Sequence, residues 1–341
     1  MSGFVIPMPV DGHVHVRDDE LLSRVLPYTT AHFGRALIMP NLVPPVVDAA
    51  SMLAYRARIR ERAPPEFEPL MTIYLTDKTT PELLFAARKA GAVAVKFYPR
   101  GATTNSTDGV KPEDFLAHHD WFEACQQAGL VVCIHAEVTH VAYPDREREF
   151  LRLFAQANLP KKFPKLRFVI EHVSTAAGVD FVRLYNNVAA SVTLHHMELT
   201  YADTANPHHF CMPIPKTEKD RRAIVKAVLY DKRRRFFLGS DSAPHVLSRK
   251  VVPEGQEPKA GAYTAPVLLP KLAELFMMAH RFQRLQDFAS LDFVNFYGLE
   301  PTERHIELVR EPYVVPMPDP TPDALVPYYA GHPIGWNVRT R

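Results

Sequence analysis

Cysteine is scarce in this chain of 341 residues, which has three, Cys125, Cys133 and Cys211. They are scattered and odd in number, so they form neither a disulfide framework nor the clustered thiols of a structural zinc module. No run of about eighteen apolar residues occurs, and the N-terminus lacks a basic segment followed by an apolar stretch. These absences predict a soluble, reduced, cytoplasmic protein.

An excess of charge of one sign is also missing. The formal net charge is +2, charged residues make up 23% and apolar residues 47% of the chain. This is an ordinary globular composition that gives no reason to expect a nucleic-acid or membrane partner. Neither a glycine-rich dinucleotide fingerprint nor a phosphate-binding P-loop is present.

Short apolar or β-branched runs alternate with amphipathic segments along the chain. The runs cover residues 4–16, 35–41, 70–76, 93–99, 130–137, 167–172, 189–196 and 235–241. Segments with helical periodicity cover residues 48–63, 80–91, 112–129, 145–156 and 218–231. Eight strand-like runs alternating with helices favour a (β/α)₈ barrel over an open doubly wound sheet. We expect one domain over residues 1–341, with a C-terminal segment from about residue 300 packing on the barrel.

The stretch VDGHVHVRDD, residues 10–19, ends a strand-like run with two histidines. Strand side chains alternate between faces, so His13 and His15 point the same way. Two imidazoles that converge on one point suit a metal ion, while the alternative is a pair of partly exposed histidines at a strand end.

Other polar residues gather at the ends of the same runs, where a barrel of this kind carries its active site. Packing alone would scatter such residues, because a buried ionisable group is costly unless it is paired. The set predicts a metal site at the mouth of the barrel, and its members are His13, His15, Arg17, Asn41, Lys96, Tyr98, His135, His172, Asp241 and His245.

Lys96 is the most informative member of this set. A partly desolvated lysine has a lowered pKa, and its neutral amine can react with CO₂ to give a carbamate whose two oxygens could bridge two cations. The alternatives are a lysine whose ammonium reaches water, or a cation that binds an anionic substrate.

Seven segments of the chain resemble the landmarks of dihydroorotases, of the compact type II bacterial and yeast-like branch of the amidohydrolase superfamily. They are HVHVRD, IMPNLVPPV, VKFYPRGATTNSTDGV, IHAEVTH, IEHVST, FCMPIPK and FLGSDSAPH. The resemblance extends in family order from about residue 9 to the C-terminal ALVPYYAGHPIGWNV. It implies a zinc-dependent cyclic amide hydrolase that interconverts N-carbamoyl-L-aspartate and L-dihydroorotate in pyrimidine biosynthesis.

The resemblance also implies a role for individual residues. His13 and His15 would bind one zinc ion with Asp241, His135 and His172 would bind a second, and N6-carboxylated Lys96 would bridge the two. A hydroxide between the ions would attack the ring amide, and Asp241 would serve as base and then acid. The implied substrate contacts are the side chains of Arg17, Asn41 and His245, the loop threonines Thr103 and Thr104, and the backbone of Met212 and Ala260.

Three alternatives stay open from the sequence. A dihydropyrimidinase or allantoinase would share the metal centre, but it gives no reason for a carboxylate-binding set of Arg17, Asn41 and His245. A metal-free barrel could be a scaffold, and a structural-zinc module could hold a closed site. The family suggests a homodimer that acts on a small molecule. The segment 246–261 lacks the cysteine-rich stretch of some bacterial members and differs in length, which bears on the position of Ala260.

Overall fold

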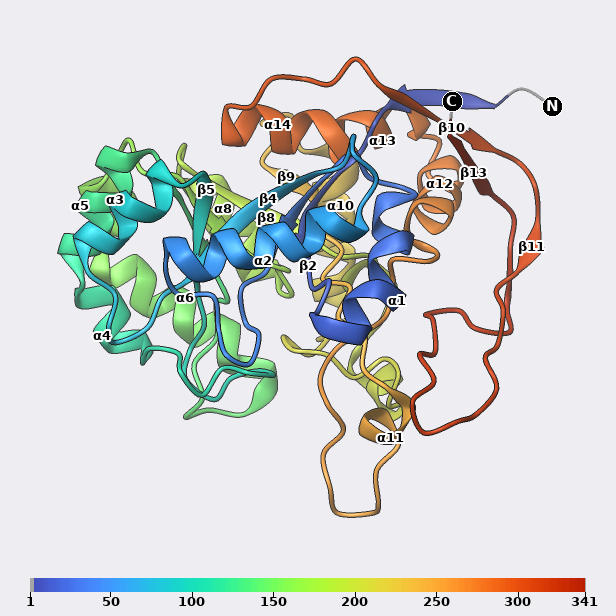
Figure 1. Ribbon diagram of the computed structural model, residues 1–341, viewed down its shortest axis with the longest axis horizontal. Coiled ribbons are helices and arrows are strands. Elements are labelled where there is room, and N and C mark those ends of the chain that lie inside the picture. The colour runs from blue at the N-terminus through green and yellow to red at the C-terminus, as the bar shows by residue number, and fades with distance from the viewer. Residues whose placement is uncertain (1–2, 341) are drawn as a thin grey trace.

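Eight parallel strands form the centre of the molecule in this computed structural model, which describes residues 3–340 (Figure 1). They are adjacent in chain order, and they are β2 (Val10–Val14), β3 (Arg35–Ile38), β4 (Glu68–Tyr74), β5 (Ala92–Phe97), β6 (Val131–Ile134), β7 (Phe168–Ile170), β8 (Val188–Val192) and β9 (Phe236–Leu238). A parallel bridge between Val14 and Ser242 brings the first strand to the last. The structure therefore confirms the predicted (β/α)₈ barrel.

Helices follow each strand and cover the outside of the barrel (Figure 1). They are α1 (Asp19–Thr30), α2 (Ala49–Arg62), α3 (Pro81–Lys89), α4 (Pro112–Ala117), α5 (His119–Ala128), α6 (Arg146–Ala157), α7 (Leu159–Lys162), α8 (Ala176–Leu184), α9 (Leu194–Glu198), α10 (Glu218–Tyr230), α11 (Leu247–Lys250) and α12 (Leu268–Met278). Local sequence explains several of their ends. The Thr80 side chain caps α3, which begins with a proline, and Gly129 ends α5 in a left-handed conformation.

The end of the barrel opposite the mouth is filled with apolar side chains. Each strand contributes at least one of them, and they include Val10, Leu37, Leu70, Ala94, Val131, Val169, Ala189 and Phe237. Phe293, Val294 and Tyr297 of α14 (Asp292–Tyr297) pack into the same cluster. The barrel interior is therefore a packed core near the strand starts, and only the C-terminal ends are free to carry chemistry.

Two predicted elements differ in the structure. The run 4–16 is two strands, because β1 (Phe4–Pro7) leaves the barrel and pairs antiparallel with β10 (His305–Val309), whose other edge binds β13 (Asn337–Thr340). The predicted helix 112–129 is divided at His118, whose ψ of 67° is not helical, into α4 and α5.

The remaining elements are short. Residues between α12 and α14 form α13 (Phe282–Gln286) and a turn of π-helix (Asp287–Leu291), and β11 (Tyr313–Val314) pairs with β12 (Pro333–Ile334). Short 3₁₀ turns cover Tyr143–Asp145 and Tyr201–Ala205. Among the helices of residues 3–340, none is long and apolar enough to cross a membrane.

Candidate metal and substrate site

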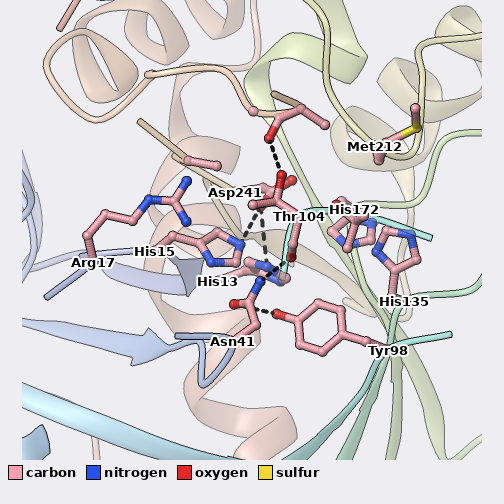
Figure 2. A pocket seen from close by; sticks show the side chains of 14 residues that line it. His13, His15, Arg17, Asn41, Tyr98, Thr104, His135, His172, Met212 and Asp241 are labelled. Atoms are coloured by element: carbon pink, nitrogen blue, oxygen red, sulfur yellow. Dashed lines mark hydrogen bonds and ion pairs between the residues drawn. The ribbon is translucent and has the colours of Figure 1, made fainter. Parts of the chain in front are cut away.

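One cavity lies at the C-terminal ends of the barrel strands, and twelve of the fourteen residues predicted for the site line it (Figure 2). These are His13, His15, Arg17, Asn41, Tyr98, Thr103, Thr104, His135, His172, Met212, Asp241 and Ala260. The other two are close by. Lys96 is the penultimate residue of β5 and is fully buried, and the His245 ring is 3.1 Å from the Arg17 guanidinium.

Three of the predicted site residues adopt a backbone conformation that is uncommon outside glycine. The φ angles are +59° at Arg17, +40° at His172 and +43° at Asp241. His172 and Asp241 follow β7 and β9 directly or within three residues, where a strand would otherwise continue. Such conformations are costly and gather at functional sites, because the surrounding structure must hold them.

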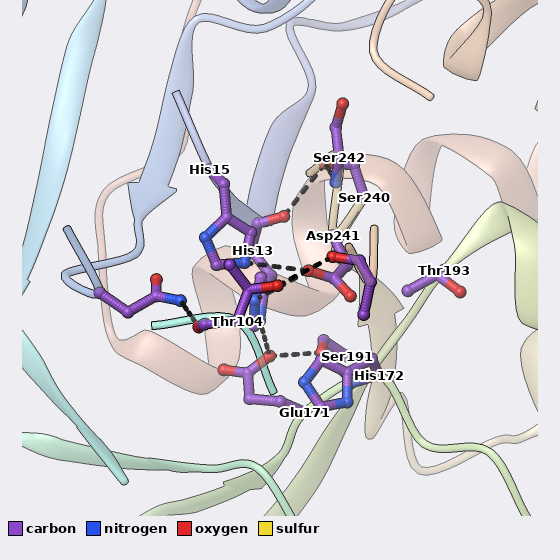
Figure 3. Close-up of polar contacts among 12 residues, drawn as sticks. His13, His15, Thr104, Glu171, His172, Ser191, Thr193, Ser240, Asp241 and Ser242 are labelled. Atoms are coloured by element: carbon purple, nitrogen blue, oxygen red, sulfur yellow. Dashed lines mark hydrogen bonds and ion pairs between the residues drawn. The ribbon is translucent and has the colours of Figure 1, made fainter. Parts of the chain in front are cut away.

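His13 lies between two carboxylates (Figure 3). Its Nδ1 is 2.8 Å from Oε2 of Glu171, which accepts a second hydrogen bond from the Ser191 hydroxyl. A carboxylate only accepts, so Nδ1 carries the hydrogen and the Nε2 lone pair is free. That Nε2 is 3.4 Å from Oδ1 of Asp241 without a hydrogen bond, so two acceptors face each other. A cation could accept the lone pair of His13 Nε2 and neutralise the carboxylate of Asp241 at the same time.

The same oxygen of Asp241 lies 3.1 Å from Nε2 of His15. The ligand atoms of His13, His15 and Asp241 all lie within 4.8 Å of one another. Burial would raise the pKa of Asp241, but His13 and His15 outweigh it and hold this pKa below its usual range. Burial lowers the pKa of His15 to about 4, so its imidazole is neutral at pH 7 and can donate a lone pair.

His135 and His172 form the opposite side of the cavity, with ring centroids 4.7 Å apart. Nε2 of His135 is 2.7 Å from Oε2 of Glu137, which leaves the Nδ1 lone pair of His135 without a partner. Nδ1 of His172 is also buried and without a partner. Burial lowers the pKa of both imidazoles, so each is a neutral donor facing the cavity.

The Lys96 amine is buried among these groups and makes no hydrogen bond. Its Nζ is 4.8 Å from the centre of the Tyr98 ring, and burial lowers its pKa. An unpartnered ammonium in such a place is costly, while a neutral amine is available for carboxylation. Free imidazole lone pairs, an acidic oxygen between two histidines and a desolvated lysine together fit a metal centre.

A second cluster of possible ligands, His195, His196 and Cys211, is buried nearby. Both ring nitrogens of His196 are occupied, one by the Thr193 hydroxyl at 2.8 Å and the other by the Pro213 carbonyl at 2.9 Å. His196 therefore has no free lone pair, and the donor set does not suit a metal ion as it stands.

The predicted carboxylate-binding residues place the positive charge of Arg17 beside the predicted metal ligands. The Arg17 side chain is 9% exposed, and its Nε donates to the Pro244 carbonyl at 3.0 Å. Burial, and after it the charge of Arg17, lowers the pKa of His245, which keeps this ring neutral. Its Nε2 is 3.1 Å from Nη2 of Arg17 and 3.0 Å from the Ala260 carbonyl, and it pairs with one or the other according to its tautomer.

The loop of residues 101–109 closes over the cavity through Asn41. The side-chain amide of Asn41 donates to the backbone carbonyl of Thr104 at 3.1 Å. The backbone carbonyl of Asn41 accepts from the side-chain amide of Asn105 at 3.0 Å. The Tyr98 hydroxyl donates to Oδ1 of Asn41 at 3.0 Å, and the Thr104 hydroxyl donates to the Ala260 carbonyl at 3.3 Å. Asn41 thus joins the loop to the cavity wall.

Sequence reasoning did not assign Glu137 or Glu171, although both orient a histidine. The signal was present, because Glu171 directly precedes His172 and Glu137 stands two residues after His135. Carboxylates beside metal-binding histidines commonly fix the ring tautomer. Asp11 also escaped notice; its Oδ1 accepts from the backbone N–H groups of His13 and Ser240 at 3.1 and 2.8 Å.

Comparisons with known proteins agree with this geometry. The family model described as amidohydrolase matches residues 10–256. The chain is 46% identical to a dihydroorotase of Azoarcus sp., covering 99% of this chain and all of that protein. Among solved structures, a dihydroorotase of Saccharomyces cerevisiae in complex with 5-fluoroorotic acid is 32% identical, with a TM-score of 0.93, covering 100% and 99% of the two chains. A Campylobacter jejuni dihydroorotase is also 32% identical, with a TM-score of 0.89 and coverage of 99% and 97%.

Proposed function

The chain belongs to the amidohydrolase family, and to its dihydroorotases, and from this membership we propose which of its residues carry out the reaction. The reaction is the reversible cyclisation of N-carbamoyl-L-aspartate to L-dihydroorotate, a step of pyrimidine biosynthesis. The observation that supports the proposal best is the geometry at His13. Its Nε2 has no hydrogen-bond partner and faces the carboxylate of Asp241, and the unpartnered imidazole nitrogens of His135 and His172 lie on the opposite side of the cavity.

The proposed cofactor is a pair of zinc ions. His13, His15 and Asp241 would hold one ion, His135 and His172 the other, and a carboxylated Lys96 would bridge them. When bound, such ions polarise a carbonyl and lower the pKa of water. Burial of Lys96 supports the carbamate, since it favours the neutral amine that reacts with CO₂.

Asp241 is the proposed proton carrier. In hydrolysis its carboxylate takes a proton from the attacking water and delivers it to the ring nitrogen as the amide bond breaks; in cyclisation the proton moves in the opposite direction. Its Oδ1 lies 3.1 Å from Nε2 of His15 and 3.4 Å from Nε2 of His13, and this is the oxygen that would bind the shared ion. The other oxygen can then turn toward the reacting atoms.

Arg17, Asn41 and His245 are proposed to bind the substrate carboxylate. The guanidinium suits a carboxylate because its N–H groups match both oxygens. Thr103 and Thr104 would donate to the substrate from the closed loop and exclude water, and the backbone of Met212 and Ala260 would contact the ring edges. For this, Asn41 and Thr104 must exchange their present partners for the substrate.

An assay of both directions before and after chelation tests this proposal. We expect turnover of L-dihydroorotate and of N-carbamoyl-L-aspartate, loss of both activities when a chelator removes the metal, and recovery with two equivalents of zinc. A metal-independent barrel, or turnover of other cyclic amides in preference, would contradict it. We also propose one domain over residues 1–341 and a cytoplasmic homodimer, the latter tested by light scattering of the purified chain.

A further inference from the structure

Lys250 is a buried lysine outside the metal centre, at the C-terminal end of α11. Its side chain is 3% exposed, and its Nζ donates three hydrogen bonds, all to backbone carbonyls. The acceptors are Phe210 at 3.0 Å, Lys259 at 2.8 Å and Gly261 at 2.7 Å. An ammonium group has three N–H donors and no acceptor, so this arrangement uses its full capacity.

A buried ammonium is costly even when it is paired, so its presence calls for a reason. The acceptors provide one. Phe210, Lys259 and Gly261 belong to irregular segments, whose carbonyls have no helix or sheet to satisfy them. Lys250 donates to carbonyls of two such segments at once, and at Phe210 its hydrogen bond adds to the one from the Gly261 N–H.

Both segments form part of the cavity wall. Met212, Ala260 and Gly261 line the cavity, and the Gly261 N–H joins the two segments by donating to the Phe210 carbonyl at 2.9 Å. Gly261 has a φ of +149°, and a Cβ added there would lie 2.3 Å from the Ala243 carbonyl oxygen. This position therefore admits only glycine, and the path of the wall is fixed.

The hydrogen bonds of Lys250 also determine the direction of the Ala260 peptide. The carbonyls on either side of Ala260, those of Lys259 and Gly261, both face Lys250. The Ala260 carbonyl faces the opposite way, toward the Thr104 hydroxyl and the His245 ring. Because Lys250 holds the carbonyls of Lys259 and Gly261 on its own side, the Ala260 carbonyl between them points into the cavity.

We propose that Lys250 is a positioning residue for substrate binding, which holds the backbone at Ala260 and next to Met212 in the orientation that the substrate meets. Lys250 does not line the cavity and acts through this backbone alone. The inference rests on the proposed function, because it takes Ala260 and Met212 as substrate contacts. It adds a residue to that site and explains why a charge is buried beside it.

The test compares Lys250→Met with Arg249→Met. Both substitutions remove one positive charge from α11, but Arg249 is exposed and its side chain is not part of the cavity wall. In Lys250→Met we expect the KM for L-dihydroorotate to rise about tenfold, with kcat changed far less, because the reacting groups are untouched. Zinc content should stay at the wild-type value, and Arg249→Met should keep the wild-type KM.

Two results would overturn the inference: a wild-type KM in folded Lys250→Met, or an equal rise in Arg249→Met, which would assign the effect to charge alone. If Lys250→Met does not fold, Lys250→Gln decides by the same comparison of KM, since an uncharged amide cannot supply three N–H donors. Failure of the proposed function would look different, because the wild-type chain itself would then turn over neither substrate.

Discussion

Nδ1 of His13 lies 2.8 Å from Oε2 of Glu171, with both side chains buried. The contact fixes the tautomer of a proposed zinc ligand from outside the cavity. Glu171→Gln replaces the carboxylate by an amide that can also donate, so the tautomer is no longer determined. We expect zinc affinity to fall about 10–100-fold, measured by competition with a chromogenic chelator. Glu303→Gln, at an exposed position, is the matched control; equal affinities in the two variants would contradict the assignment.

Removal of the proposed proton carrier is expected to reduce turnover without unfolding the barrel. Asp241→Asn keeps the shape of the side chain but cannot shuttle a proton, so kcat should fall at least ~10²-fold. The melting temperature and the circular dichroism spectrum should remain close to wild type. Near-normal turnover in this variant would exclude Asp241 from the mechanism.

Loss of the Lys96 amine is expected to reduce both metal content and activity. Lys96→Ala removes the proposed bridge, and short carboxylic acids should restore part of the activity by occupying the space that the side chain leaves. Metal analysis by mass spectrometry and assays with added acetate or propionate measure the two effects. A variant with full metal content and full activity would rule out the carbamate.

The loop threonines are expected to affect substrate use and not metal binding. Thr103→Ala and Thr104→Ala should each lower kcat/KM by ~1–3 kcal/mol if a buried substrate oxygen loses its donor. Zinc content should be unchanged, because neither hydroxyl is a proposed ligand. Wild-type kinetics in the double variant would make the loop a simple connection between β5 and α4.

The KM is expected to depend on pH through Lys250, whose pKa burial lowers to about 8. As pH rises through this value the ammonium loses one of its three N–H donors, so one carbonyl of the wall loses its partner. KM should therefore be constant below pH ~7 and rise from pH ~7 to ~9, and it should not change over this range in Lys250→Met. The neighbouring groups do not titrate there: the pKa of Arg17 is lowered to about 10, that of Cys211 is raised, and those of three imidazoles are lowered, namely His208, His209 and His245.

Much of the fold could be predicted because its signals are local. Apolar runs and helical periodicity indicate where strands and helices lie, and their alternation indicates the barrel. The departure of β1 from the barrel could not be predicted in this way, since its partner β10 begins near residue 305 and no local pattern marks that pairing. The division of the helix at His118 likewise depends on a backbone angle that packing imposes.

For the site, strand ends indicated the residues that meet in the cavity, because parallel strands bring their ends to one face. Glu137 and Glu171 were less evident, since an acidic residue in a strand-end motif is also common on a surface. Lys250 could not be found from sequence, because its partners are carbonyls, which every residue has. A sequence therefore reveals ionisable and metal-binding side chains more readily than it reveals which backbone carbonyls a buried side chain such as Lys250 will bind.

The sheet of β1, β10 and β13 joins the beginning of the chain to its end, and Figure 1 shows the N and C labels on the same side of the molecule. During synthesis β1 leaves the ribosome early, but its partner β10 is made only after the whole barrel. Until then Phe4 and Val5 have no strand beside them, and the edge of β1 is open to other chains. This small sheet therefore forms only after the strands of the barrel have been made, and chains released before β10 would carry an unpaired first strand.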